Sequence, residues 1–246
     1  MWLTRALALA ICLSGLACAA SELCYVVDSE LYLTDRAADL MNVPRLSPEM
    51  ARQGNQLLLD ALRQKDRLGP VGISFQDARQ IYLELATHPV ASLGAIRRYD
   101  PEGCWGFCMG RALTAKLLAD RMGVPPENTL KIWAVGTIAT REGKTFHGHV
   151  ATLVKAKEGG WYVLDTELGT VATPDRWYHQ IQNVNPSGDV QLRLSRGSRL
   201  GPSAKLRLED LTRGGATGPY FRELIASFIE LQPPSATSPT RLVVPD

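Results

Sequence analysis

Apolar residues recur at helical spacing over roughly the first third of the chain, from residue 24 onward. Ser47-Pro48 predicts the start of one helix, with serine as its cap and proline at its first position. Ser74 and Asp77 have the spacing of a capping box and predict a second helix, which His88-Pro89 stops. This part of the chain is therefore expected to be mainly helical.

A third helix is predicted in the centre of the chain, from Cys108 to Met122. Gly123 is a C-terminal stop signal, and Pro125-Pro126 cannot continue a helix. The apolar positions that share its helical spacing are Phe107, Ala112, Ala115, Leu118 and Ala119. Cys108 is thus expected at the beginning of an apolar helix.

Three β-rich runs follow, over residues 130–138, 149–156 and 161–165, and Glu158-Gly159-Gly160 predicts a hairpin turn between the last two. Strand follows strand without the helical crossovers that a parallel sheet needs. The order predicts an α+β fold in which a helix packs on an antiparallel sheet. Residues 186–246 are expected to form a C-terminal extension with one helix, from Pro219 to Leu231, and a disordered Pro/Ser/Thr-rich tail.

Residues 1–19 are expected to be a signal peptide, because Arg5 precedes an apolar stretch and small residues fit cleavage after Ala19. The stretch is shorter than the roughly 20 residues that span a bilayer. Cys18 leaves lipidation open, but a secreted or periplasmic protein is favoured. The net charge of +2 comes with no run of five basic residues, so we expect neither a nucleic acid nor, for the mature chain, a membrane as partner.

Cys108 lies where a helix can activate a thiol, because unpaired N–H groups and the dipole of a helix N-terminus favour the thiolate. Such a nucleophile also needs a base and a group that orients the base. His149 begins an apolar strand and is the preferred base, whereas His147 is expected in the preceding loop. Both histidines are expected to face the helix, and Asp165 can orient the imidazole if the two strands are antiparallel neighbours.

Each of these residues also has a structural interpretation, as a core cysteine, a strand histidine and a turn aspartate. His147 and His149 with a cysteine leave a zinc site open, although the sequence offers no second ligand pair. A binding module that keeps the fold without activity is a further alternative.

Three motifs carry a family resemblance. Cys108 to Ala112 match Cys-x-x-Arg-Ala at a helix start, residues 149–154 match a His-Val-Ala-x-Leu-Val strand, and residues 163–168 match apolar-apolar-Asp-x-x-Leu. In this segment, which ends near Trp177, the chain resembles the secreted bacterial protein-glutaminases. Gly103-Cys104-Trp105 matches another triplet typical of that family, so Cys104 is a rival nucleophile. Cys108 is preferred because it alone has Arg-Ala at the right offset.

The resemblance implies a papain- or transglutaminase-like catalytic core over residues 96–185, with Cys108, His149 and Asp165 as the triad. It implies deamidation of glutamine side chains in proteins or peptides, with release of ammonia and without a cofactor or metal. Transglutamination and proteolysis by the same triad stay open. The helical region over residues 20–95 lies outside the match and is either a pro-region or an integral part of the fold.

Export would leave Cys24, Cys104 and Cys108 in the mature chain. In an oxidising compartment this odd number favours one disulfide and one free thiol. Because a nucleophile must stay free, we expect a Cys24–Cys104 disulfide. A bridge between Cys104 and Cys108 is the alternative, and it would silence the enzyme.

Overall fold

The computed structural model describes residues 44–63, 72–103, 107–139, 143–202, 206–213, 215 and 217–230. The elements in chain order are α2 (Pro48–Arg63), α3 (Phe75–Thr87), α4 (Leu93–Ile96), α5 (Cys108–Arg121), η2 (Pro126–Asn128), β1 (Thr129–Ala139), β2 (Thr145–Lys155), β3 (Trp161–Leu164), η3 (Thr166–Leu168), α6 (Pro174–Asn183), β4 (Gln191–Arg196), α7 (Leu208–Arg213) and α8 (Gly218–Glu230). Helices and an antiparallel sheet are combined, as the predicted α+β class requires.

The four strands form one sheet in the order β3-β2-β1-β4, and every neighbouring pair is antiparallel. β2 and β3 form the predicted hairpin, in which β3 pairs with β2 from Thr152 to Lys155. β4 pairs with the other edge of β1. Residues 191–196, within the expected C-terminal extension, are therefore a strand of the main sheet.

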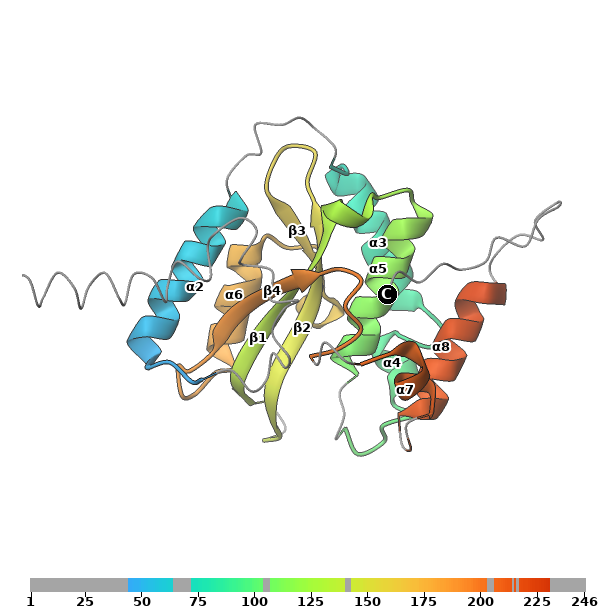
Figure 1. Ribbon diagram of the computed structural model, residues 1–246. Coiled ribbons are helices and arrows are strands. Elements are labelled where there is room, and N and C mark those ends of the chain that lie inside the picture. Colours follow the sequence, from blue (N-terminus) through green and yellow to red (C-terminus); the bar gives the residue numbers. More distant parts are fainter. Residues whose placement is uncertain are drawn as a thin grey trace, which may run out of the picture.

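Helices cover both faces of this sheet (Figure 1). α5 packs on β2 with α3 and α8 beyond it, while α2 and α6 cover the opposite face. Ala112 of α5 packs against Val150 and Trp133 of the sheet, whereas Leu113 and Leu118 belong to the core shared with α3 and α8. α5 is thus a central helix, which explains why small and apolar residues occupy most of its circumference.

The predicted helix ends agree with the structure. Ser74 and Asp77 form a reciprocal capping box at the start of α3, with N···O distances of 3.1 and 3.2 Å. α5 begins at Cys108 and is followed by Gly123, whose φ of 78° is the left-handed conformation that ends many helices. α6 was not among the predicted elements, although Thr173 caps it and Pro174 occupies its first turn.

The structure corrects two expectations about β2. His147 lies in the strand rather than in a loop, because β1 continues past an irregularity and pairs Ile138 with Phe146. His149 itself reaches Cys108 at the start of α5, but Ala151 and Leu153, which alternate with it, lie in the core beneath α2 and α6. Alternation shows which residues share a face of a strand, but not which layer covers that face.

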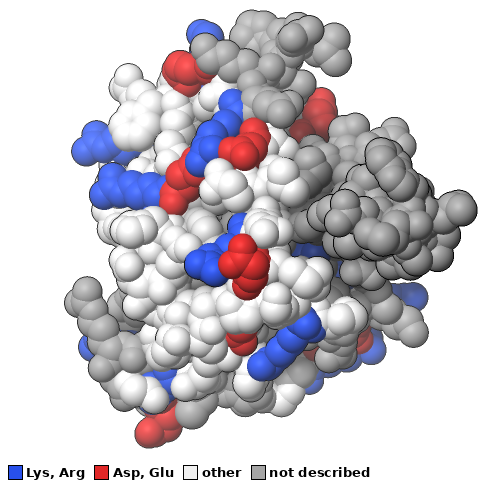
Figure 2. Space-filling model, turned by 90° about the vertical axis from the view of Figure 1, so that its left-hand side faces the viewer, with Lys and Arg blue, Asp and Glu red and all other residues white. Residues whose placement is uncertain are grey.

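The expected signal peptide, Cys18, Cys24, Cys104 and the Pro/Ser/Thr-rich tail lie outside the described residues. Within the described part of the chain, no helix is both long and apolar enough to cross a membrane. On the face turned to the viewer in Figure 2, basic and acidic side chains lie next to each other instead of forming a field of one sign.

Candidate active site

Cys108 is the first residue of α5, a half-buried residue whose thiol forms no disulfide. The preceding residue, Phe107, has φ 47° and ψ 29°, and it is the only non-glycine residue with positive φ among those described. For an L-residue this left-handed conformation costs on the order of 1–2 kcal/mol, so other contacts must hold it. The sulfur therefore lies at a helix start whose first N–H groups have no partner within the helix.

Asp165 is buried at the end of β3 and is surrounded by hydrogen-bond donors. Its Oδ2 atom lies 2.6 Å from Nε2 of His149 and 2.8 Å from Nε1 of Trp177, which donates a hydrogen bond. Its Oδ1 atom accepts a hydrogen bond of 3.1 Å from the backbone N–H of Glu167. These contacts fix the carboxylate and leave Nδ1 as the ring nitrogen of His149 that can meet the thiol of Cys108.

The pairing of the strands explains how His149 and Asp165 meet. β3 follows β2 only as far as the pair of Leu164 with Thr152, so Asp165 comes directly after the last paired residue. His149 lies beyond this point on β2, where its ring meets Asp165. The ring of His149 also stacks on that of Trp177, with 6.0 Å between centroids.

A hydrogen bond between β2 and α5 holds the start of the helix against the strand. Thr152 Oγ1 donates to the carbonyl oxygen of Ala112 at 2.6 Å, and Val150 packs on Ala112. Ala112 lies one turn along the helix from Cys108. The packing of α5 on β2 therefore brings the thiol close to His149, which lies near the middle of the strand.

Electrostatics favour a charged pair at this site. Burial opposes the thiolate, but the hydrogen bond and charge of His149, aided by Arg111 and the N–H of Val150, hold the pKa of Cys108 below its usual value. Burial also opposes an imidazolium, but Asp165 and Cys108 raise the pKa of His149 to about 10. Despite its own burial, Asp165 keeps a pKa of about 2, because His149, Arg111 and Trp177 stabilise its charge. The site therefore favours the thiolate of Cys108 and the imidazolium of His149 over their neutral forms.

The guanidinium group of Arg111 links α5 to the turn η3 that follows Asp165. Arg111, with a side chain 5% exposed, donates to Glu167 across 2.6 Å between Nη2 and Oε1. Both residues lie in the sequence motifs, Arg111 in Cys-x-x-Arg-Ala and Glu167 at a variable position after Asp165, but no contact between them was predicted. Their types and spacing gave no sign of the pairing, because the residues are 56 positions apart.

The structure brings Cys108, His149 and Asp165 together, and it places the other histidines elsewhere. His147 and His179 are exposed, and His88 is buried against α8. Among the described residues, no cluster of three or more His, Cys, Asp or Glu side chains has an arrangement that could hold a metal ion. Cys104, the rival nucleophile, lies outside the described residues.

No family model and no curated protein sequence match this chain. Among solved structures, the chain is similar to the NMR structure of protein-glutaminase from Chryseobacterium proteolyticum. The identity is 18% and the TM-score is 0.41, over 55% of this chain and 77% of that chain. At these values the similarity indicates a distant relationship of fold at most.

Proposed function

We propose that this protein is a cysteine amidohydrolase with Cys108 as nucleophile, His149 as acid and base, and Asp165 as the group that orients His149. The observation that carries the proposal is the continuous contact from the thiol through His149 to Asp165, with each pKa displaced towards the charged form. Covalent amide hydrolysis needs these three roles. A core resembling that of papain and the transglutaminases is part of this proposal.

The proposed substrate is the side-chain carboxamide of glutamine in a protein or peptide, which becomes glutamate. Support for this choice comes from the motifs around the three residues, which resemble those of protein-glutaminases. The signal-like N-terminus supports a secreted or periplasmic location, where the substrate would be an exported or extracellular protein. The proposed reaction requires no cofactor.

In the acylation step, the Cys108 thiolate attacks the carboxamide carbon, and the carbonyl π electrons move to oxygen. The N–H groups at the start of α5 can stabilise this oxyanion. When the tetrahedral intermediate collapses, the C–N bond breaks, and His149 gives its proton to the nitrogen, which leaves as ammonia. A thioester and a neutral imidazole remain.

In the deacylation step, neutral His149 takes a proton from water, and the hydroxide formed attacks the thioester carbon. The C–S bond then breaks, which releases the glutamate side chain and restores the thiolate and imidazolium. Asp165 stays ionised throughout and fixes the tautomer and orientation of the ring. Access of water at this step distinguishes hydrolysis from transfer to an amine.

The test incubates the purified protein with a blocked peptide that contains one internal glutamine, with and without a primary amine. Ammonia, peptide mass, cross-linked product and cleaved product are measured together. We expect ammonia release with a mass gain of about 1 Da, as an amide becomes an acid, and no activity on the matched asparagine peptide. Amine incorporation would favour transglutamination, and backbone cleavage would favour proteolysis. If wild-type protein gives no product and its thiol alkylates no faster than a free cysteine, the inactive binding module is favoured.

A further inference from the structure

Phe107, the left-handed residue before the nucleophile, is packed into a cluster of aromatic rings. Its ring lies 4.2 Å from that of Tyr220 and 6.4 Å from that of Phe221, measured between centroids, and both partners belong to α8. Tyr99 makes edge contacts with Phe107 at 6.5 Å and with Tyr220 at 5.3 Å. Phe107 and Tyr220 are both buried. The conformation of Phe107 is thus held by residues far from it in sequence.

Tyr220 also packs closely against α5 at Gly110. A Cβ atom added to Gly110 would lie 2.2 Å from Cε1 and 2.3 Å from the hydroxyl oxygen of Tyr220. A glycine is therefore required in the first turn of α5 because the phenol ring occupies this space. The buried hydroxyl has no hydrogen-bond partner among the described residues, so the contact is made by the ring and not by a polar bond.

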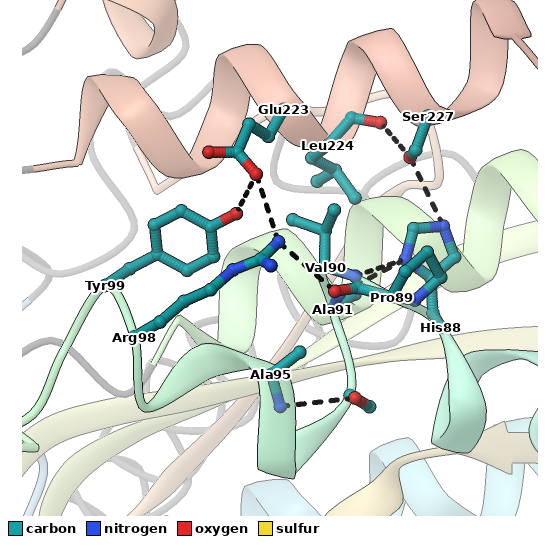
Figure 3. Close-up of polar contacts among 11 residues, drawn as sticks. His88, Pro89, Val90, Ala91, Ala95, Arg98, Tyr99, Glu223, Leu224 and Ser227 are labelled. Atoms are coloured by element: carbon teal, nitrogen blue, oxygen red, sulfur yellow. Dashed lines mark hydrogen bonds and ion pairs between the residues drawn. The ribbon is translucent and has the colours of Figure 1, made fainter.

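α8 is itself anchored to the segment that follows α3 (Figure 3). The Glu223 carboxylate accepts hydrogen bonds from Tyr99 at 2.5 Å and from Arg98 at 3.0 Å. Further along α8, the ring of Phe228 stacks on that of His88, with 5.3 Å between ring centroids. These contacts leave α8 little freedom to move away from the start of α5.

From these contacts we infer that Tyr220 is a positioning residue for the nucleophile. Its ring fills the space beside Gly110 and supports Phe107 in the left-handed conformation, which directs the Cys108 sulfur and the first N–H groups of α5 towards His149. This inference deepens the proposed function and rests on it. It places a requirement for catalysis in α8, outside residues 96–185.

The test compares Tyr220→Leu, Tyr220→Phe and Leu224→Ala in the full chain. Leu224 is buried one turn further along α8 and is not among the residues of the ring contacts, so its substitution controls for lost stability. Cys108 alkylation by iodoacetamide is measured against pH, together with turnover and thermal unfolding. We expect Tyr220→Leu to slow alkylation at pH 7 and turnover by about tenfold or more, because misplaced reacting groups lose roughly this much. Tyr220→Phe, which keeps the ring, should restore both.

Leu224→Ala should lower the unfolding temperature but leave the pH profile of alkylation unchanged. If Leu224→Ala and Tyr220→Leu change the alkylation profile equally, Tyr220 is only a core residue and the inference is overturned. Alkylation needs no substrate, so it tests the role of Tyr220 even if the wild-type protein releases no ammonia and the proposed function fails.

Gly110→Ala provides a second test that does not depend on the Tyr220→Leu variant alone. The added methyl group should slow alkylation strongly in the wild-type background and much less in the Tyr220→Leu background, where space is available. Equal effects of Gly110→Ala in the two backgrounds would contradict a direct contact between these residues.

Discussion

Arg111 of α5 donates a hydrogen bond of 2.6 Å to Glu167, two residues after Asp165. The contact joins the helix that carries Cys108, the proposed nucleophile, to the turn that follows Asp165. The two side chains differ in burial: that of Arg111 is 5% exposed and that of Glu167 is 49% exposed. The buried guanidinium also lowers the pKa of both Cys108 and Asp165. Arg111 is therefore expected to matter more than Glu167.

Arg111→Met should move the pH profile of Cys108 alkylation to higher pH, because a positive charge that favours the thiolate is lost. Arg111→Lys should move it less. Glu167→Gln, which keeps a polar partner on the exposed side, should change the free energy of unfolding by less than about 1 kcal/mol. Iodoacetamide kinetics and denaturant unfolding measure these effects. An unchanged alkylation profile in Arg111→Met would contradict an electrostatic role.

The three proposed catalytic residues should differ in the severity of their loss. Cys108→Ala and His149→Ala should each lower turnover by about 10⁴-fold or more, because nucleophile and base act as one unit. Asp165→Ala should be severe but leave more activity, since the acid only orients the ring. His147→Ala is the matched control, because His147 is an exposed residue two positions away on the same strand. Full turnover in Cys108→Ala would direct attention to Cys104.

The charged pair predicts a bell-shaped dependence of kcat/KM on pH. Raising the pH through about 10 removes the proton from His149 and should lower activity. Lowering the pH through the depressed pKa of Cys108 protonates the thiolate and should also lower activity. In Asp165→Asn the alkaline limb should move to lower pH, because the carboxylate that raises the pKa of His149 is gone. An alkaline limb that stays in place would contradict this coupling.

Local signals sufficed to predict the helices and strands that carry the site. The capping box at Ser74 and the stop at Gly123 act within a few residues, so they can be identified without knowledge of the tertiary structure. The motif order Cys108, His149, Asp165 predicted which side chains to compare. Their meeting depends on β3 being the antiparallel neighbour of β2, which the short turn between these strands favours.

Contacts between distant elements could not be predicted in this way. Nothing near Tyr220 in the sequence indicates that its ring lies against Gly110, since 110 positions separate the two residues. The same holds for the strand β4, which looked like part of an extension because its partner β1 lies more than 50 positions earlier. Helical and strand periodicity identify a buried face but not the residues that cover it.

The Cys24–Cys104 disulfide stays a prediction that mass spectrometry can test. The free thiol of Cys108 agrees with the requirement that the nucleophile stay unbridged. Unreduced, alkylated protein from an oxidising compartment should give a linked peptide with Cys24 and Cys104 and an alkylated Cys108. A peptide in which Cys104 is bridged to Cys108, with Cys24 alkylated, would contradict the prediction and indicate a redox switch.

The N-terminal helices contribute to both cores of the molecule. Ile81 and Leu85 of α3 are fully buried in the cluster that contains α5, while Leu58 and Leu62 of α2 cover the other face of the sheet. Loss of these helices would expose the sheet to solvent on one face and α5 on the other. Burial of a large aliphatic side chain stabilises a protein by about 1.5–3 kcal/mol, so the loss of several should exceed the usual stability of a domain.

We therefore predict that the region of residues 20–95 is required for folding, through α2 and α3, and is not a removable pro-region. A chain that begins at residue 96 should lack a cooperative thermal transition and release no ammonia from the glutamine peptide, whereas a chain that begins at residue 20 should show both the transition and ammonia release. Ile81→Ala in the longer chain should lower the free energy of unfolding by about 2–5 kcal/mol. Leu83→Ala, at an exposed position of the same helix, is the control and should have little effect. A truncated chain that folds and shows higher activity would establish a pro-region instead.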